Sequence, residues 1–239
     1  MELYLDLCSQ PCRSVFLMAK ALNIPFEFKH VDLAAGQHYS EEFGKISTMR
    51  KVPVMKDGDF ILTESTAILE YMVHKNGGPD HWFPSNLQSR ARINEYLSWQ
   101  HTSLRSTCSK VFLLRTVFPM MMGCEAPPEK MDPAVQDMND SLSLLENYFL
   151  QNKAFICGEK ISVADVVAIA EIMQPVATGV DVFVGRPKLS TWRDRVKVQL
   201  GEQLFKEANE VIMKINDLPQ TIDKKALEMM KPKFQKMFS

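Results

Sequence analysis

Six consecutive residues near the start of the chain, Cys8 to Arg13, hold one hydroxyl, two thiols and one guanidinium. Ser9 is followed by Pro11, a pair typical of a helix start, because serine accepts from a free backbone N–H and proline lacks one that would stay unpaired there. A helix start also attracts anions through its free N–H groups and its dipole. The sequence therefore predicts an anion site at Ser9, and the residues alone leave the anion open.

The thiols beside Ser9 allow two interpretations. Cys8 is either a buried, inert thiol or a reactive one, while a disulfide from Cys8 to Cys12 would distort the helix start and is not expected. The chain of 239 residues has five cysteines, an odd number that does not suggest a disulfide framework. The simplest expectation is free thiols in a reducing, cytosolic compartment.

The elements around Ser9 predict a βαβ unit. Leu3, Leu5 and Leu7 alternate with polar residues, which is the period of a strand. The apolar run from Val15 to Ala19 predicts a helix, and the segment from Pro25 to Val31 alternates again. Two strands joined by a helix within about 30 residues should lie parallel, with a right-handed crossover.

A second group of elements follows in residues 32–76. Ser40 before two glutamates predicts a short capped helix. Asp57-Gly58 between two short apolar runs predicts a hairpin, and Thr63-Glu64-Ser65 precedes another helix. Pro53, at the start of a strand, cannot donate to a sheet, so this strand lies at an edge or the Val52–Pro53 bond is unusual. Residues 1–76 therefore predict the order β-α-β-α-β-β-α.

The remainder of the chain predicts helices only. Glycine and proline between Asn76 and Pro84 suggest a linker over 77–87, and residues 88–239 form a second, helical domain. Apolar steps of three and four residues predict one long helix through Ile93, Leu97, Leu104, Cys108 and Val111.

Further helices are expected from their starting residues. Asp132-Pro133 predicts a helix start, and Ser162 with Asp165 has the spacing of a capping box. The helix after Ser162 is apolar nearly all round, which places it at the centre of the second domain. Additional helices are expected from Pro187 and around Phe205. A basic tail from Lys224 to Phe238 either folds back over a cleft as a helix or frays at the surface.

Composition excludes several function classes. Lys and Arg number 28 and Asp and Glu 29, so the near-zero net charge argues against a general grip on nucleic acid or an anionic membrane. The apolar runs are far shorter than the ~20 residues of a membrane span, and no basic and then apolar leader is expected. Apolar residues make up 46% of the chain, enough for a sizeable core.

Several motifs, in this order, together resemble a cytosolic glutathione transferase. They are Ser9-Gln10-Pro11-Cys12-Arg13, Lys51-Val52-Pro53 and Glu64-Ser65, followed by an all-helical second half. The serine near the N-terminus, Gly36-Gln37-His38 and the basic tail are similar to the theta class. The resemblance covers essentially the whole chain. It implies an α/β N-terminal thioredoxin-like domain, with Pro53 after a cis bond, plus an all-α C-terminal domain.

The resemblance implies that Ser9 acts on the thiol of glutathione. An unperturbed thiol has a pKa of ~8.5, and lowering it by about two units needs roughly 2.7 kcal/mol in favour of the thiolate. A hydrogen bond from the Ser9 hydroxyl would supply about 1.5–3 kcal/mol. The start of the helix adds up to ~1 kcal/mol. Ser9 is then a hydrogen-bond donor to the thiolate and not a nucleophile.

The resemblance also implies the residues that bind the remainder of glutathione. They are Val52 through its backbone for the cysteinyl unit, Lys51 and His38 for the glycyl carboxylate, Ser65 for the γ-glutamyl carboxylate, Glu64 for the ammonium, and Gln10 as a lesser candidate. Arg105 either reaches the second-substrate cleft and steadies an anionic leaving group or is a surface residue.

The expected function is transfer of small electrophiles to reduced glutathione. The resemblance implies alkyl and arylmethyl halides, epoxides and sulfate esters as substrates, with peroxidase activity on organic hydroperoxides as a further expectation. It implies a homodimer that needs no metal and no cofactor besides glutathione as co-substrate. Two alternatives stay open: an omega-like, glutathione-dependent thiol reductase that uses Cys8, and a non-enzymatic interaction module with the same fold.

Overall fold

The computed structural model describes residues 1–215 and residue 228. The tail of residues 224–238, for which both a folded-back helix and a frayed end were considered, lies outside the described residues except for residue 228. The expected break at Leu218-Pro219 also lies outside them.

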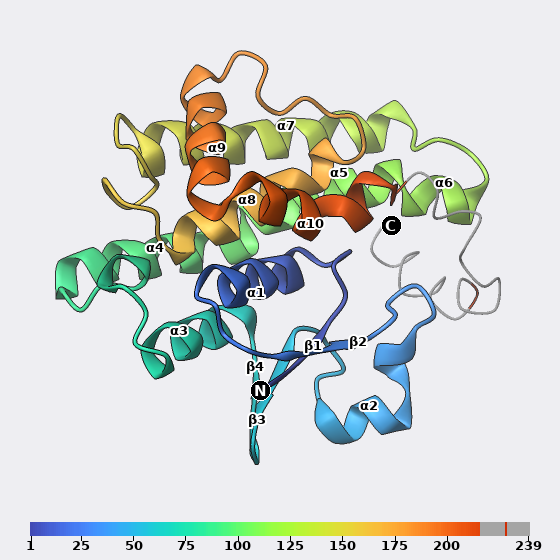
Figure 1. Ribbon diagram of the computed structural model, residues 1–239. Coiled ribbons are helices and arrows are strands. Elements are labelled where there is room, and N and C mark those ends of the chain that lie inside the picture. Colours follow the sequence, from blue (N-terminus) through green and yellow to red (C-terminus); the bar gives the residue numbers. More distant parts are fainter. Residues whose placement is uncertain (216–227, 229–239) are drawn as a thin grey trace.

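A mixed sheet organises the first part of the chain (Figure 1). Its strands, in the spatial order β2-β1-β3-β4, are β1 (Glu2–Leu5), β2 (Glu27–His30), β3 (Val54–Asp57) and β4 (Phe60–Thr63). β1 pairs parallel with β2 and antiparallel with β3. Both the βαβ unit and the hairpin were predicted. The hairpin turn lies one residue later than Asp57-Gly58, because Asp57 still pairs with Phe60 and Gly58 and Asp59 form the loop.

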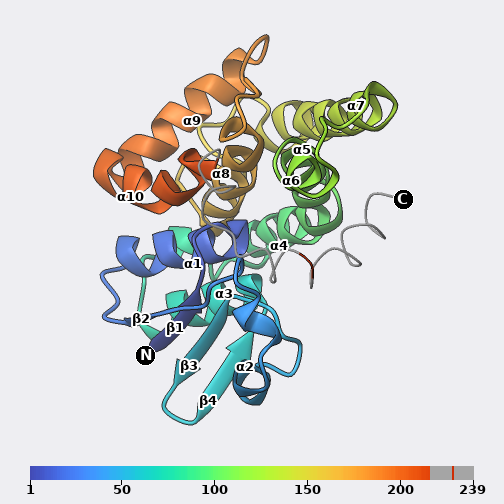
Figure 2. The same cartoon turned by 90° about the vertical axis from the view of Figure 1, so that its right-hand side faces the viewer.

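Helices cover both faces of this sheet. The helical segments are α1 (Gln10–Ala21), the 3₁₀ turn η1 (Gln37–Tyr39), α2 (Glu41–Ile46) and α3 (Ser65–Lys75). Leu3, Leu5 and Met55 face the core beneath α1 and α3. The alternate residues Tyr4 and Val54 pack on the opposite face with Phe43 of α2. Figure 2 shows α1 and α3 on one side of the strands and α2 on the other.

The second part of the chain is helical throughout its described residues. After the 3₁₀ turn η2 (Asp80–Trp82), the elements are α4 (Leu87–Thr102), α5 (Leu104–Arg115), α6 (Val117–Met122), α7 (Pro128–Leu144), the π-helical turn η3 (Leu145–Leu150), α8 (Val163–Val176), α9 (Pro187–Leu200) and α10 (Glu202–Met213). Every α8 residue from Val163 to Pro175 is buried, so the predicted central helix is confirmed.

The prediction of one long helix through residues 93–111 is wrong. The chain leaves helical geometry at Ser103, with φ −108° and ψ −85°, and α4 and α5 meet there. Thr107 Oγ1 donates to the Ser103 carbonyl at 3.0 Å, which satisfies an oxygen near the break. The apolar steps do not reveal the break, because Leu97 and Leu104 remain buried on either side of it.

The predicted helix start at Asp132-Pro133 is also wrong. α7 begins at Pro128, and Pro133 lies inside the helix. Pro128 suits the first helical position, where a missing N–H costs nothing. Pro133 lies one turn further on, where a proline removes an intrahelical hydrogen bond that the remainder of this long helix can spare.

The predicted capping box at the start of α8 is confirmed. The Ser162 side chain accepts from the Ala164 backbone, and Asp165 Oδ2 accepts from Ser162 N at 2.9 Å. Asp165 is fully buried, and its Oδ1 accepts from Ile156 N at 2.9 Å and from Trp192 Nε1 at 2.8 Å. One carboxylate therefore joins the start of α8 to the preceding loop and to α9.

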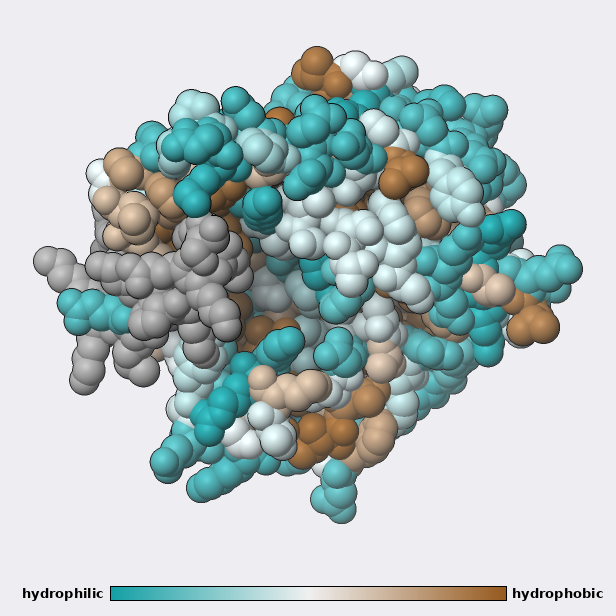
Figure 3. All heavy atoms as spheres, turned by 180° about the vertical axis from the view of Figure 1, so that it is seen from behind, coloured by the Kyte–Doolittle hydropathy of each residue, from teal (hydrophilic) through white to brown (hydrophobic). Residues whose placement is uncertain are grey.

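The face behind that of Figure 1 is mostly hydrophilic. Figure 3 shows teal residues around most of this face, white residues across its middle and brown residues gathered in a few patches. Within the described part of the chain, none of the helices combines the length and apolar character that crossing a membrane would need.

Replacing Asp165 by alanine should strongly destabilise the fold. The change leaves the N–H groups of Ile156, Ser162 and Trp192 buried without an acceptor, each at a cost of about 1–3 kcal/mol. We expect the free energy of unfolding in urea to fall by at least about 3 kcal/mol. The control is Asp137→Ala, which removes only an exposed 3.8 Å pair with Lys110 and should change it by less than ~1 kcal/mol. Equal stability of the two variants would contradict this role.

Candidate active site

Ser9 is the N-cap residue of α1, as predicted, but its side chain does not form the expected capping bond. Its backbone is extended, with φ −85° and ψ 126°, and its hydroxyl accepts no cap hydrogen bond. Pro11 occupies the second helical position and has no N–H to donate. The half-buried hydroxyl instead lies near the thiol of Cys12. Ser9 therefore stands at the helix start without being used as a cap.

The turn that carries Ser9 is held by Asp6. Its Oδ1 accepts from Cys8 N at 2.8 Å, and its carbonyl accepts from Ser9 N at 2.9 Å. Its Oδ2 also accepts from Leu33 N at 3.0 Å, which ties the turn to the segment after β2. Asp6 is itself buried. One side chain that precedes the helix therefore binds the turn at Cys8 and also the segment after β2.

Both thiols of this turn are in surroundings that disfavour a thiolate. Burial, together with the charge of Asp6, raises the pKa of Cys8 to about 12. Burial also raises the pKa of Cys12 to about 12, against a hydrogen bond with Ser9 that lowers it. At neutral pH both groups are protonated, so the interpretation of Cys8 as an inert thiol is favoured over that of a reactive one.

Strand register brings the predicted glutathione-binding segments to one edge of the sheet. Tyr4 of β1 pairs with Val54 of β3, so the end of β1 lies beside the start of β3. Val54 pairs with Thr63, which brings the end of β4 to the same edge. The last residue of β2 also lies there, because β2 is parallel to β1. The segments of Ser9, Val52–Pro53, Glu64–Ser65 and, after β2, His38 therefore leave the sheet at this edge.

The residues at this edge differ in exposure. The Val52–Pro53 peptide bond is cis, as predicted, and Pro53 is buried. Ser65 is buried as the first residue of α3, whereas Glu64 before it is exposed and has a left-handed φ of +66°. Such a backbone costs a non-glycine residue about 1–3 kcal/mol and is typical of functional sites. Lys51 is exposed.

The loop around His38 is fastened by a residue that the sequence prediction missed. His38 is half-buried, with its ring 3.8 Å from that of Tyr39. Arg50 donates from Nη1 to the carbonyl of Ser40 at 2.8 Å and also to that of Tyr39. Gly44 leaves room for this guanidinium, because an added Cβ would lie 2.8 Å from Arg50 Nη2. Arg50 thus joins the His38 loop to the segment before Val52.

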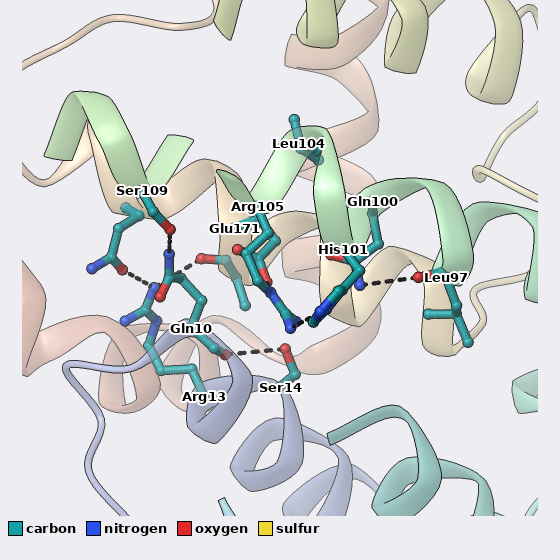
Figure 4. A network of polar contacts seen from close by, with 12 residues as sticks. Gln10, Arg13, Ser14, Leu97, Gln100, His101, Leu104, Arg105, Ser109 and Glu171 are labelled. Atoms are coloured by element: carbon teal, nitrogen blue, oxygen red, sulfur yellow. Dashed lines mark hydrogen bonds and ion pairs between the residues drawn. The ribbon is translucent and has the colours of Figure 1, made fainter. Parts of the chain in front are cut away.

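Gln10 points away from this edge. It is buried, and its Nε2 donates to Ser109 Oγ of α5 at 2.7 Å (Figure 4). Its side chain therefore joins the two parts of the chain, and its predicted contact with glutathione gains no support from this geometry.

Arg105 is neither a free surface residue nor an isolated cation. Its Nε donates to Glu171 Oε1 of α8 at 2.8 Å, and its Nη1 lies 3.1 Å from His101 Nδ1 (Figure 4). Its side chain is 15% exposed and that of Glu171 is fully buried. Burial raises the pKa of Glu171, while the Arg105 charge lowers it. The ion pair orients Arg105 and leaves its Nη2 without a partner among the described residues.

Arg13 is a buried cation to which the sequence analysis assigned no role. Arg13 is fully buried, and it donates to the turn before α1 and to Gln174 of α8. Glu171 and Gln174 interrupt an otherwise apolar helix, and that interruption is the pattern from which their polar roles could have been suspected. The amino-acid sequence gives no indication of which partners they meet.

Comparison with known proteins places this geometry in one family. Residues 4–74 match the model described as glutathione S-transferase, N-terminal domain, and residues 111–199 match the model of the C-terminal domain. The chain is 52% identical over 219 residues to glutathione S-transferase theta-1 of Homo sapiens, covering 92% of this chain and 91% of the relative. It is 48% identical over 231 residues to theta-3 of Mus musculus, covering 97% and 96%.

Solved structures agree with these relatives. The apo form of human glutathione-S-transferase T1-1 has a TM-score of 0.95 at 49% identity, covering 100% of this chain and 99% of that one. Human theta-2 with glutathione and an unknown ligand has a TM-score of 0.91 at 43% identity, covering 96% of each chain. Human theta-class transferase in complex with the glutathione conjugate of 1-menaphthyl sulfate has a TM-score of 0.90 at 43% identity, covering 96% of each chain.

Cys8 should resist alkylation in the native protein. A thiol with a pKa of about 12 holds roughly three thousandfold less thiolate at neutral pH than an unperturbed one at ~8.5. Treatment with iodoacetamide followed by peptide mass spectrometry should modify the exposed Cys124 and leave Cys8 unmodified. A Cys124→Ser variant should then take up almost no label, and fast labelling of Cys8 in that variant would contradict the expectation.

Proposed function

The chain belongs to the theta class of the glutathione S-transferases, and from this premise we propose that Ser9 activates the thiol of glutathione for attack on small electrophiles. The enzyme is a glutathione transferase, so the open questions concern its residues and its second substrate. The observation that carries the proposal is the Ser9 hydroxyl, which stands at the start of α1 without serving as its cap. A hydroxyl in that position, beside the protonated thiol of Cys12, can donate to an anion bound at the helix start.

Lowering the pKa of the glutathione thiol requires only a modest free energy from Ser9 and the helix start. A hydrogen bond to the thiolate contributes about 1.5–3 kcal/mol, and the helix start adds up to ~1 kcal/mol. Together they match the roughly 2.7 kcal/mol that lowers a thiol pKa by two units. Both contributions favour the thiolate over the thiol, so a larger fraction of bound glutathione is ready to attack. Ser9 itself forms no bond to the substrate.

The remaining groups of glutathione match the residues at the same edge of the sheet. The Val52 backbone precedes the cis bond and pairs with the cysteinyl unit. Ser65 offers its hydroxyl and the free N–H groups of the α3 start to the γ-glutamyl carboxylate, and the exposed Glu64 takes the ammonium. Lys51 and His38 take the glycyl carboxylate. Each charge of the tripeptide then meets an opposite charge or a helix start.

The second substrate is a small electrophile that loses an anion. The human theta-class relative described with the glutathione conjugate of 1-menaphthyl sulfate suggests arylmethyl sulfate esters. The Arg105 side chain is 15% exposed, and its buried Nη2 has no partner among the described residues, so we assign this guanidinium to the leaving anion. Alkyl and arylmethyl halides belong to the same proposal, because thiolate attack on carbon releases halide. Epoxides belong to it as well, although their ring opens on attack and the oxygen stays in the product as an alkoxide that takes up a proton. Peroxidase activity on organic hydroperoxides would need thiolate attack on oxygen instead.

Partners and surroundings complete the proposal. We infer a homodimer, as in the family, and a cytosolic, reducing compartment, since all five cysteines are free. The omega-like alternative requires an acidic Cys8 thiol, whereas burial raises the pKa of that group. The non-enzymatic alternative does not agree with membership in a family of enzymes.

Replacing Ser9 by alanine should slow the reaction without abolishing glutathione binding. Loss of about 1.5–3 kcal/mol in the thiolate hydrogen bond lowers kcat roughly 10- to 100-fold and moves the pH profile of kcat/KM upward by at least about one unit. Turnover of glutathione with an arylmethyl halide, followed across pH, measures both effects. The control is Ser14→Ala, since Ser14 lies inside α1 and bonds only the Gln10 carbonyl. Unchanged kcat in Ser9→Ala would rule out the role of Ser9.

Replacing Lys51 by alanine should weaken glutathione binding and leave the chemical step intact. One charge-assisted contact is worth about 1.5–3 kcal/mol when desolvated and less when exposed, so KM for glutathione should rise roughly 5- to 20-fold with kcat within about twofold. The matched control is Lys56→Ala, because Lys56 pairs with Glu2 at the opposite end of β1. A KM for glutathione equal to that of the wild type would show that Lys51 does not contribute to glutathione binding.

A further inference from the structure

Arg13 of α1 donates hydrogen bonds to the backbone of residues 7 and 8, in the turn that carries Ser9. Arg13 Nη1 donates to the carbonyl of Leu7 at 2.9 Å and to that of Cys8 at 3.1 Å. Its Nη2 donates to the carbonyl of Ala170 at 2.8 Å and to Gln174 Oε1 at 2.6 Å. One guanidinium thus binds two oxygens of the turn and two of α8, and Figure 4 shows it extending from α1 toward that helix.

Gln174 makes the second contact between α8 and the turn. Its Oε1 accepts from Arg13, and its Nε2 donates to the Cys8 carbonyl at 3.2 Å. The Cys8 oxygen therefore has two donors, one from each residue. It belongs to the planar peptide group that ends at the Cα of Ser9. Fixing that oxygen fixes the plane from which the Ser9 side chain projects, and so it limits where the hydroxyl can point.

This arrangement is expensive for a residue with a purely packing role. A buried guanidinium costs several kcal/mol unless its donors are satisfied, and an apolar side chain of similar volume avoids that cost. Burial lowers the pKa of Arg13 to about 10, and the charge of Glu171 opposes this, so the group is still a cation at neutral pH. Its two terminal nitrogens bind three carbonyls and one amide oxygen, two of them in the turn and two in α8, while Nε has no partner among the described residues. The guanidinium therefore holds the backbone of the turn against α8.

We propose that Arg13 and Gln174 are positioning residues of the transfer reaction, which hold the Cys8–Ser9 peptide so that the Ser9 hydroxyl faces the sulfur of glutathione. The inference rests on the proposed role of Ser9 and extends it to the second domain. The thiol is activated by a hydroxyl of the first domain whose direction is set by α8.

The test replaces Gln174 and Arg13, each by a residue of similar size. Gln174→Met removes both amide contacts, and Arg13→Lys keeps the charge but cannot bind four acceptors in a fork. In each variant the pKa of the bound glutathione thiol, followed by thiolate absorbance, should rise by about one unit. We expect kcat/KM for an arylmethyl halide at neutral pH to fall roughly 10-fold, with KM for glutathione within about twofold.

The control separates positioning from stability. Asn209→Leu removes another buried amide, which donates only to the Phe205 carbonyl within α10. It should leave the thiol pKa and the pH profile unchanged, and Tm measured for both variants shows how much stability each has lost. If Gln174→Met folds, loses stability and shows the wild-type thiol pKa and pH profile, the inference is wrong. Should Arg13→Lys fail to fold, Gln174→Met alone decides.

A double variant distinguishes failure of this inference from failure of the role of Ser9. When Gln174 acts through Ser9, Gln174→Met adds little in the Ser9→Ala background, so the two effects are not additive. Full additivity would overturn the inference. A thiol pKa that Ser9→Ala does not change would overturn the role of Ser9 instead, and an effect of Ser9→Ala without one of Gln174→Met would overturn the positioning alone.

Discussion

The packing of α1 between two surfaces is the constraint on which the structure depends. All its residues from Cys12 to Ala19 are buried, because the sheet and α3 lie on one side and α8 and α10 on the other. Such a helix cannot shift without opening two hydrophobic contacts at once. Its N-terminus is therefore a fixed point, and the strand register gathers the three other binding segments at the same edge of the sheet. The site is built where a rigid helix start meets a sheet edge.

Local chemistry made much of this fold predictable from the sequence. Alternation at Leu3 and Leu5, the capping residue Ser40 and the pair Ser162 and Asp165 each encode their own element within a few residues. The order and direction of the strands alone predict that the binding segments meet at one edge of the sheet, without any knowledge of side-chain positions. The errors at Ser103 and Asp132-Pro133 arose where apolar periodicity continues across a change that only the backbone records.

Polar partners far apart in the sequence could not be predicted. Gln10 meets Ser109, Arg13 meets Gln174, and Arg105 meets Glu171, over separations of 99, 161 and 66 residues. Each of these polar side chains could equally well have been exposed to solvent. The sequence alone does not distinguish a buried amide that is hydrogen-bonded within the protein from one that contacts a ligand. Gln10 illustrates this. Its position next to Ser9 suggested a contact with glutathione, but its side chain donates to Ser109 in the other domain.

These contacts make the two domains one functional unit. The linker predicted over residues 77–87 separates them along the chain, yet a single hydrophobic cluster runs from Leu3 to Ile215 without a boundary there. The first domain by itself would expose the face of α1 that packs on α8 and would leave Arg13 without two of its four acceptors. A buried cation that loses its acceptors draws water or moves away, and either change releases the carbonyl groups that fix Ser9. The domain that carries the hydroxyl therefore depends on its neighbour for the direction in which that hydroxyl points.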